Sequence, residues 1–303
     1  MSTVDLTQLP PPEVEDTLDF EAILAKRKAT LISYYPADQQ AAIAATLELE
    51  SEPLNKLLQE NAYNEMILRA RINDAAKQTL LAFASGTTLD HVAGEYELER
   101  LLVTPGDPSA TPPIEPVYES DDRLRMRCQM AYEGMATAGP VNAYKFHALS
   151  ASAEVADVAV DSPTPGTVRV TILSPAGQPS ADTLNLVEQA LSAEDVRPLC
   201  DLVAVEPAQI KPYAVDATLN AIGLGKEQAI AAAKDAMAKT AAAYYRVGAT
   251  VPLSAIYAAL HQPGIDSVTL RAPLTDVTCS AQQAAKLTSI TLDLGHHHGK
   301  RPL

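Results

Sequence analysis

The sequence predicts an α+β protein: a helical N-terminal region followed by one or two small α+β domains with mixed sheets. Two observations predict this class. Apolar residues recur at helical spacing up to about residue 153, whereas short runs after residue 155 alternate with period two between further helices. A chain of 303 residues with 47% hydrophobic content is long and apolar enough for two or three globular domains.

The first 104 residues are expected to be an arm followed by helices. Residues 1–16 contain three consecutive prolines at 10–12, which lock φ and remove hydrogen-bond donors, so we predict an extended arm. Residues 17–104 form the predicted helical region. Two helices are expected at about 17–33 and 37–50, because Tyr34, Tyr35 and Pro36 interrupt the apolar pattern.

The longest helix is expected over residues 51–84. Ser51 can cap it, and Pro53 is tolerated in a first turn. Apolar side chains occupy more than one side of this helix, so it needs partners on more than one side. Either other helices of this chain or helices of other chains could supply them. The candidate protein–protein contacts are Leu54, Leu57, Leu58, Ala62, Tyr63, Met66, Ile67, Leu68 and Ile72.

Residues 85–103 form a joint after this helix. Gly86 can adopt the left-handed conformation that ends a helix. Thr87 and Asp90 have the spacing of a capping box, which predicts a new helix start. One face of that helix is apolar, and it consists of Leu89, Val92, Ala93 and Tyr96.

The remaining chain divides at a proline-rich linker, residues 105–120, which holds five prolines. Residues 121–210 are expected to form helices plus a first α+β domain: helices 121–138 and 141–153, strands 155–160 and 167–173, helix 181–193 and strand 201–205. Residues 211–303 are expected to form a second α+β domain, with strand 213–219, helix 226–245, a shorter helix ending near 260, and strands 265–270 and 289–294.

Charge and cysteine content exclude several classes of protein. The formal net charge of −15 argues against nucleic-acid and anionic-membrane binding, which need clustered cations. The sequence contains no run of about 20 apolar residues, so no transmembrane helix is expected. The N-terminus does not look like a signal peptide. The three cysteines lack metal-ligand spacing and suit a reducing cytoplasm. His296, His297 and His298 would bind metal only adventitiously, so we expect no metal site and no cofactor.

Catalytic chemistry is not expected either. Asp90 and His91 are adjacent on a predicted helix and therefore point away from each other. None of the common nucleophile or metalloprotease motifs is present. Arg123 and Arg125 form a candidate ion-pair motif, either within the chain or between chains.

The stretch DDRLRMRCQMAYEGMATAGPVNAYKFHAL, with the later Ser162, Pro163 and the strand after Gly166, resembles the baseplate J family of contractile-tailed phages. The preceding GTTLDHVAGEYELER is similar to the helical joint of that family. The resemblance covers about residues 40–300 and is strongest over 80–175. The order and spacing of these individually weak motifs carry it.

This resemblance implies a structural wedge subunit of a contractile tail baseplate, located in the virion tail and assembled in the host cytoplasm. It implies tail protein I, other copies of the chain, and sheath-initiating and tail-hub proteins as partners. The helix 51–84 would join a bundle with other chains, and residues 211–303 would form a ring contact that helps to transmit fibre engagement to sheath contraction. The family offers no catalytic residues to transfer.

Two other functions stay open from the residues alone. An acidic cytoplasmic hydrolase would need two carboxylates facing one cleft, and no such pair can be nominated from the sequence. A surface-binding, adhesin-like module is disfavoured by the absence of Trp and the presence of only 3 Phe, because carbohydrate platforms need aromatic rings.

Overall fold

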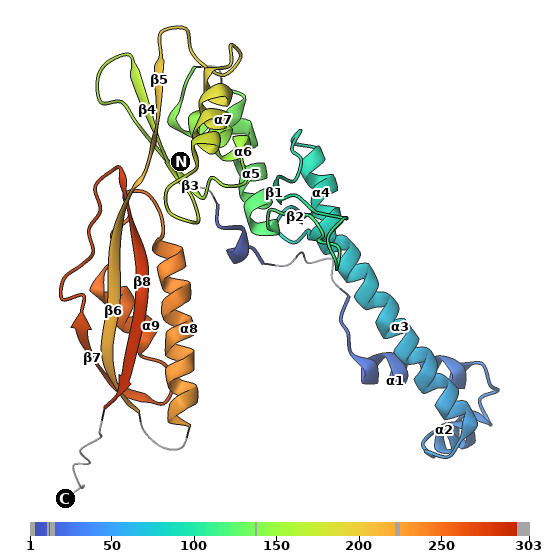
Figure 1. Cartoon of the computed structure of the whole chain (residues 1–303). Helices are drawn as coiled ribbons and strands as arrows, with labels where there is room; N and C mark the ends of the chain where they lie inside the picture. Colours follow the sequence, from blue (N-terminus) through green and yellow to red (C-terminus); the bar gives the residue numbers. More distant parts are fainter. Residues whose placement is uncertain (1–3, 11, 13–15, 137, 222–224, 296–303) are drawn as a thin grey trace, which may run out of the picture. The chain divides into compact units, whose positions relative to one another are not determined.

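The computed structural model describes residues 4–10, 12, 16–136, 138–221 and 225–295 (Figure 1). It divides into two compact units. The first comprises Met1–Glu99 with Asp121–Arg125, and the second comprises Arg100–Ser120 with Met126–Leu303. The predicted α+β class, helical first and sheet-containing afterwards, is confirmed. His296, His297 and His298 lie outside the described residues, as does part of the expected arm.

The first unit is helical. It contains the short 3-10 helix η1 (Leu6–Gln8) and the helices α1 (Phe20–Ser33), α2 (Gln40–Leu47), α3 (Pro53–Gln78) and α4 (Gly86–Gly94). Asp19 begins α1 by accepting a hydrogen bond from the amide of Ala22 at 3.0 Å. The break between α1 and α2 falls at the predicted Tyr-Tyr-Pro sequence.

Two details of the long helix differ from the prediction. It is capped by Glu52 and not by Ser51, and it ends at Gln78, six residues before the expected end. The Gln78 side chain accepts a hydrogen bond from the amide of Ser85 at 2.9 Å, which closes a turn over the intervening residues. Gly86 does have the predicted left-handed φ of 54°, but Ser85, not Thr87, is the N-cap of α4.

The second unit begins with a short hairpin in the expected linker. Strand β1 (Leu102–Thr104) pairs antiparallel with β2 (Val117–Tyr118). The segment 105–120 therefore contains a structured strand. Helix α5 (Asp121–Gly134) follows, and its first five residues are grouped with the first unit. Helix α6 (Val141–Ala151) comes next, after Gly139 and Pro140.

The first three-stranded sheet has the order β3-β4-β5. Strand β3 (Asp157–Asp161) is antiparallel to β4 (Thr167–Leu173), and β5 (Leu202–Pro207) is parallel to β4 after the crossover helix α7 (Ala181–Ser192). Apolar side chains of α6 and α7 pack against β3 and β4 in one buried cluster, which includes Tyr144, Val170, Ile172 and Leu191.

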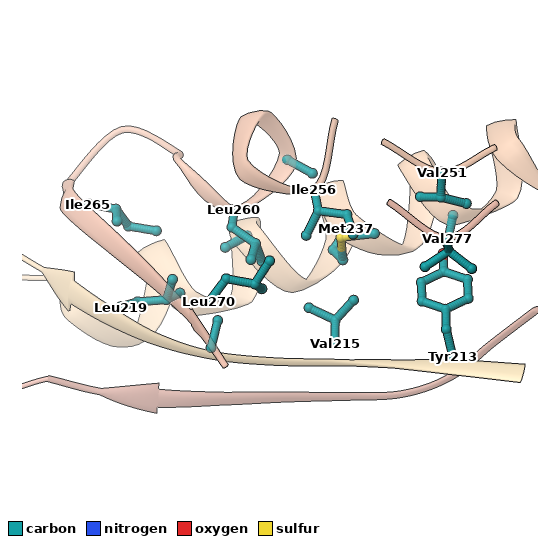
Figure 2. Close-up of a cluster of buried hydrophobic side chains, with 14 of the residues drawn as sticks. Tyr213, Val215, Leu219, Met237, Val251, Ile256, Leu260, Ile265, Leu270 and Val277 are labelled. Atoms are coloured by element: carbon teal, nitrogen blue, oxygen red, sulfur yellow. The ribbon is translucent and has the colours of Figure 1, made fainter. Parts of the chain in front are cut away.

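The second sheet has the order β7-β6-β8 and contains longer strands. Its elements are β6 (Gln209–Ala221), α8 (Lys226–Tyr244), α9 (Leu253–Leu260), β7 (Ile265–Ala272) and β8 (Gln283–Leu294). Strand β6 is antiparallel to β7 and parallel to β8. Figure 2 shows Tyr213, Val215 and Leu219 of β6 pointing toward the helices, where they meet Met237 of α8 and Leu260 of α9.

The two sheets are joined within the second unit. Only Ala208 separates β5 from β6, and Ala208 is buried with Leu173 and Ala284. The Tyr245 hydroxyl donates a hydrogen bond to the carbonyl of Ser174 at 2.8 Å, and the amide of Val247 donates to Asp157 at 2.8 Å. The expected boundary near residue 210 is thus a packed junction.

Candidate interaction surface

One side of α3 is covered by helix α1 of the same chain (Figure 1). Ile23 and Leu24 of α1 are buried against Ala62, with Leu58 and Met66 packed around them. Ala62 is fully buried, so its assignment as a contact with a partner protein is corrected: it belongs to the core of its own unit. Leu58 and Met66 are half-buried in the same contact.

A shared carboxylate reinforces this helix pair. Glu65 of α3 lies 2.7 Å from the guanidinium of Arg27 on α1 and 2.6 Å from that of Arg69, one turn further along α3. Hydrogen bonds from Arg69 and then from Arg27 hold the pKa of the Glu65 carboxyl below its ordinary value. The charged form of Glu65 therefore helps to hold α1 in place.

Buried asparagines complete the side of α3 that faces its own chain. Asn73 donates to the carbonyl of Asp16 at 2.8 Å and accepts from the amide of Asp16 at 2.9 Å, which ties the end of the arm to α3. Asn55 donates to the carbonyl of Leu49 at 3.2 Å and fixes the turn before α3. Both side chains are buried. Both lie on the same helical face as Ala62, and a pattern of apolar residues alone does not include this signal.

The other sides of α3 expose two rows of large apolar side chains. Leu57, Leu68 and Ile72 form the first exposed row, with exposed fractions of 55%, 58% and 60%. Tyr63 and Ile67 form the second exposed row. Leu54 is half-buried at the start of the helix. Because large apolar side chains gathered on the exposed sides of one helix indicate an interaction site, these two rows are the candidate surface.

Arg125 of the candidate ion-pair motif has a structural role within the chain. Arg125 pairs with Asp122 at 2.9 Å and donates to the carbonyls of Leu81 and Ala84, at 2.9 Å and 2.7 Å. It therefore satisfies backbone acceptors in the turn after α3. Arg123 is half-buried in the first turn of α5.

A deeply buried ion pair was missed by the sequence prediction. Arg127 of α5 pairs with Glu119, and both side chains are almost completely buried. Glu119 also accepts from the amide of Leu101 at 3.0 Å, and its carbonyl accepts from Arg100 at 2.7 Å. The pair attaches the hairpin β1–β2 to α5. The spacing of Glu119 and Arg127 in the sequence does not indicate that they are in contact.

Two cavities of the described structure have at most one acidic side chain each in their walls. Across the described residues, no cluster of three or more His, Cys, Asp or Glu side chains is placed to hold a metal ion. A cavity of about 250 Å³ beside α8 is lined by alanines, Pro175, Tyr245, Lys286 and Leu287, without a carboxylate. A second cavity, between α1 and α3, has Glu65 as its one carboxylate. Neither cavity contains the carboxylate pair that a hydrolase would need.

Membrane insertion by a helix is likewise not indicated. Within the described parts of the chain, every helix is too short or too polar to cross a bilayer.

Comparisons with known proteins agree with the family resemblance. Models of the Baseplate J-like N-terminal domain and the Baseplate J-like central domain match residues 50–107 and 136–207. Baseplate protein J of Escherichia phage P2 is 48% identical over 298 residues, which cover 97% of this chain and 99% of that protein.

Among solved structures, the 6-fold symmetrised cryo-EM structure of the anti-feeding prophage (AFP) baseplate aligns with a TM-score of 0.41 and 12% identity. That alignment covers 58% of this chain and 43% of the other, so it spans less than half of the other chain's length. The P2 relative is far more similar, because its identity extends over nearly the whole of both chains. On that ground, this chain belongs to the family of phage baseplate protein J.

Proposed function

We propose that this chain is a structural wedge subunit of a contractile tail baseplate, in which α3 packs against helices of tail protein I and of other copies of the chain. The observation that carries the proposal is the exposure of five large apolar side chains on α3, although α1 already covers one side of it. Membership of the baseplate protein J family supports a structural role in a baseplate, and no catalytic function is assigned.

Burial of these rows would supply a substantial part of the assembly energy. Full burial of a Leu, Ile or aromatic side chain contributes about 1.5–3 kcal/mol relative to exposure. Two rows on different sides of one helix suit two partner helices, as in a helical bundle. The association must still offset about 4–15 kcal/mol of lost translational and rotational freedom, so contacts beyond α3 are required.

We further infer that residues 211–303 form a contact between neighbouring wedges around the tail hub. Its helices and sheet share one closed core, so the domain can transmit a displacement as a rigid body. Fibre engagement would then shift the ring between two arrangements and release sheath contraction, with contacts to sheath-initiating and tail-hub proteins differing between the two states. Assembly would take place in the host cytoplasm before the virion is completed.

The experiment is co-expression of the chain with tail protein I, followed by co-purification and light scattering. The test variant carries both Leu57→Asp and Leu68→Asp, and the control variant carries Leu186→Asp on α7, which is also an exposed leucine on a helix. The double variant should lose the complex because buried carboxylates without partners are costly, whereas the control should keep it. Circular dichroism should show that both variants fold.

Normal complexes formed by the double variant would refute the assignment of α3 as the bundle helix. Failure of the unmodified chain to bind tail protein I would refute the proposed partner.

A further inference from the structure

We propose that the groove between α1 and α3 seats a partner helix whose apolar stripe is flanked by carboxylates. This inference rests on the proposed function and deepens it, since it specifies the side of α3 and the charge of the helix that docks there. The groove is a cavity of about 370 Å³ between the two helices.

The groove continues into the first exposed row. Its apolar lining consists of Leu31 of α1, Tyr34 just after the end of that helix and Leu58 of α3, and Tyr34 is 78% exposed. Residues three or four apart are neighbours on a helix surface, so Leu68 lies next to Glu65 at the edge of the groove. The apolar surface is therefore broader than α3 alone, and a helix placed there would contact two helices at once.

The charge around the groove is positive, although the unit that contains it is acidic. Lys26 and Arg27 line the cavity together with Glu65. Glu65 is shared by Arg27 and Arg69, so one carboxylate serves two guanidinium groups. Lys26 has no ion pair among the described residues, whereas the neighbouring Lys28 is paired with Glu48.

The two cations in the cavity wall, Lys26 and Arg27, outnumber its one carboxylate, and the adjoining Arg69 adds a further positive charge beside Glu65. A helix with carboxylates next to its apolar stripe would satisfy them, and a helix flanked by lysines would be repelled. The partner is therefore expected to be acidic along the edge of its contact face.

Two designed helical peptides provide a direct test with the full chain. They share length and apolar stripe, but glutamates flank the stripe in one and lysines in the other, and binding is followed by fluorescence anisotropy. We expect the acidic peptide to bind at least about tenfold more tightly, with a preference that weakens as salt is raised. Lys26→Glu should remove most of that preference. Lys234→Glu, an equal charge change on the exposed surface of α8, should leave it unchanged.

Equal affinity for the two peptides, no binding of either, or an equal loss in Lys26→Glu and Lys234→Glu would overturn the proposal. These results are separable from failure of the proposed function. A chain that co-purifies with tail protein I but shows no charge preference would refute the groove alone. A chain that prefers the acidic peptide but never binds tail protein I would refute the proposed partner alone.

Discussion

Helices α3 and α8 are the two longest helices that the structure describes, and they differ in how much of their apolar surface the chain covers. The 19 residues of α8 bury Ala229, Ala233, Met237 and Ala241 in the core of their own domain. The structure describes every residue of α8, and none of them is a large apolar residue with an exposed side chain. The 26 residues of α3 bury only Asn55, Ala62 and Asn73, and they expose five large apolar side chains.

This difference separates a helix whose apolar side chains are covered within the chain from one that leaves apolar side chains uncovered. Small residues on the buried face of α8 allow close packing on the sheet, and its outer face is polar or alanine. On α3 two asparagines are buried, where they anchor the arm and a turn, and five large apolar residues are exposed. A monomeric protein rarely arranges a helix in this way, which supports the proposal that α3 packs against other chains.

The largest effect on the isolated chain is expected for Met237→Ala in α8. Met237 is fully buried between α9 and β6 (Figure 2), so its truncation leaves a cavity and should destabilise the domain by about 2–5 kcal/mol. Denaturant unfolding followed by circular dichroism measures this change. A decrease of less than about 0.5 kcal/mol in the free energy of unfolding would mean that α8 is not part of a closed core. The contrast between α8 and α3 would then be wrong.

A smaller effect is expected for Asn73→Ala in α3. This variant leaves the amide and carbonyl of Asp16 without their partner, which should cost about 1–2 kcal/mol and release the arm from α3. Hydrogen exchange of residues around Asp16 reports the release. Asn64→Ala is the matched control, since Asn64 is exposed and bonds only to Glu60 within the helix. Equal exchange in the two variants would contradict an anchoring role for Asn73.

Acid should loosen α1 from α3 through Glu65. Arg69 and Arg27 lower the pKa of Glu65 in the folded chain. The ion pairing therefore contributes its full stability at pH values above the pKa that Glu65 has in the unfolded chain. This stability is lost as the pH falls through the lower pKa that Glu65 has in the folded chain. Thermal unfolding of the helical unit should therefore shift downward below about pH 4, the ordinary range of a glutamate. Glu65→Gln should reduce that pH dependence, and an unchanged profile in this variant would exclude Glu65 as its source.

The smallest effect on the isolated chain is expected for Leu68→Ala. This side chain is more than half exposed, so its truncation should change the free energy of unfolding by less than about 0.5 kcal/mol. The same variant should weaken co-purification with tail protein I. A loss of stability comparable to that of Met237→Ala would show that the first exposed row is already buried within the chain.

The sequence predicted the helices and strands after residue 121, because their signals are local, although β6 and β8 begin before their predicted bounds. Alternation from Val168 to Ile172 and the turn residues before it placed β4 at its observed bounds. The end of α3 was misplaced because Leu80 and Phe83 continue the apolar spacing, whereas the turn depends on Gln78, Ser85 and the distant Arg125. Such tertiary contacts override helical periodicity.

The candidate surface was predicted only in part for a related reason. Periodicity identifies which residues of α3 are apolar, but it does not tell whether α1 or another chain covers them. Ala62 and Leu57 both belong to the candidate contacts predicted on this helix, yet the first is buried by α1 and the second is exposed. The pair Glu119–Arg127 was missed because Glu119 lies in a proline-rich stretch that is typical of a linker.

The most direct test of the central claim is thiol labelling at position 68 in the free and the assembled protein. Leu68→Cys, in a chain whose exposed Cys200 is replaced by serine, reports access to the first exposed row, and Leu186→Cys on α7 serves as the control. Both sites should react quickly in the free chain, and only position 68 should become protected in the complex with tail protein I and in the assembled baseplate. Unchanged reactivity at position 68 after assembly would contradict the account.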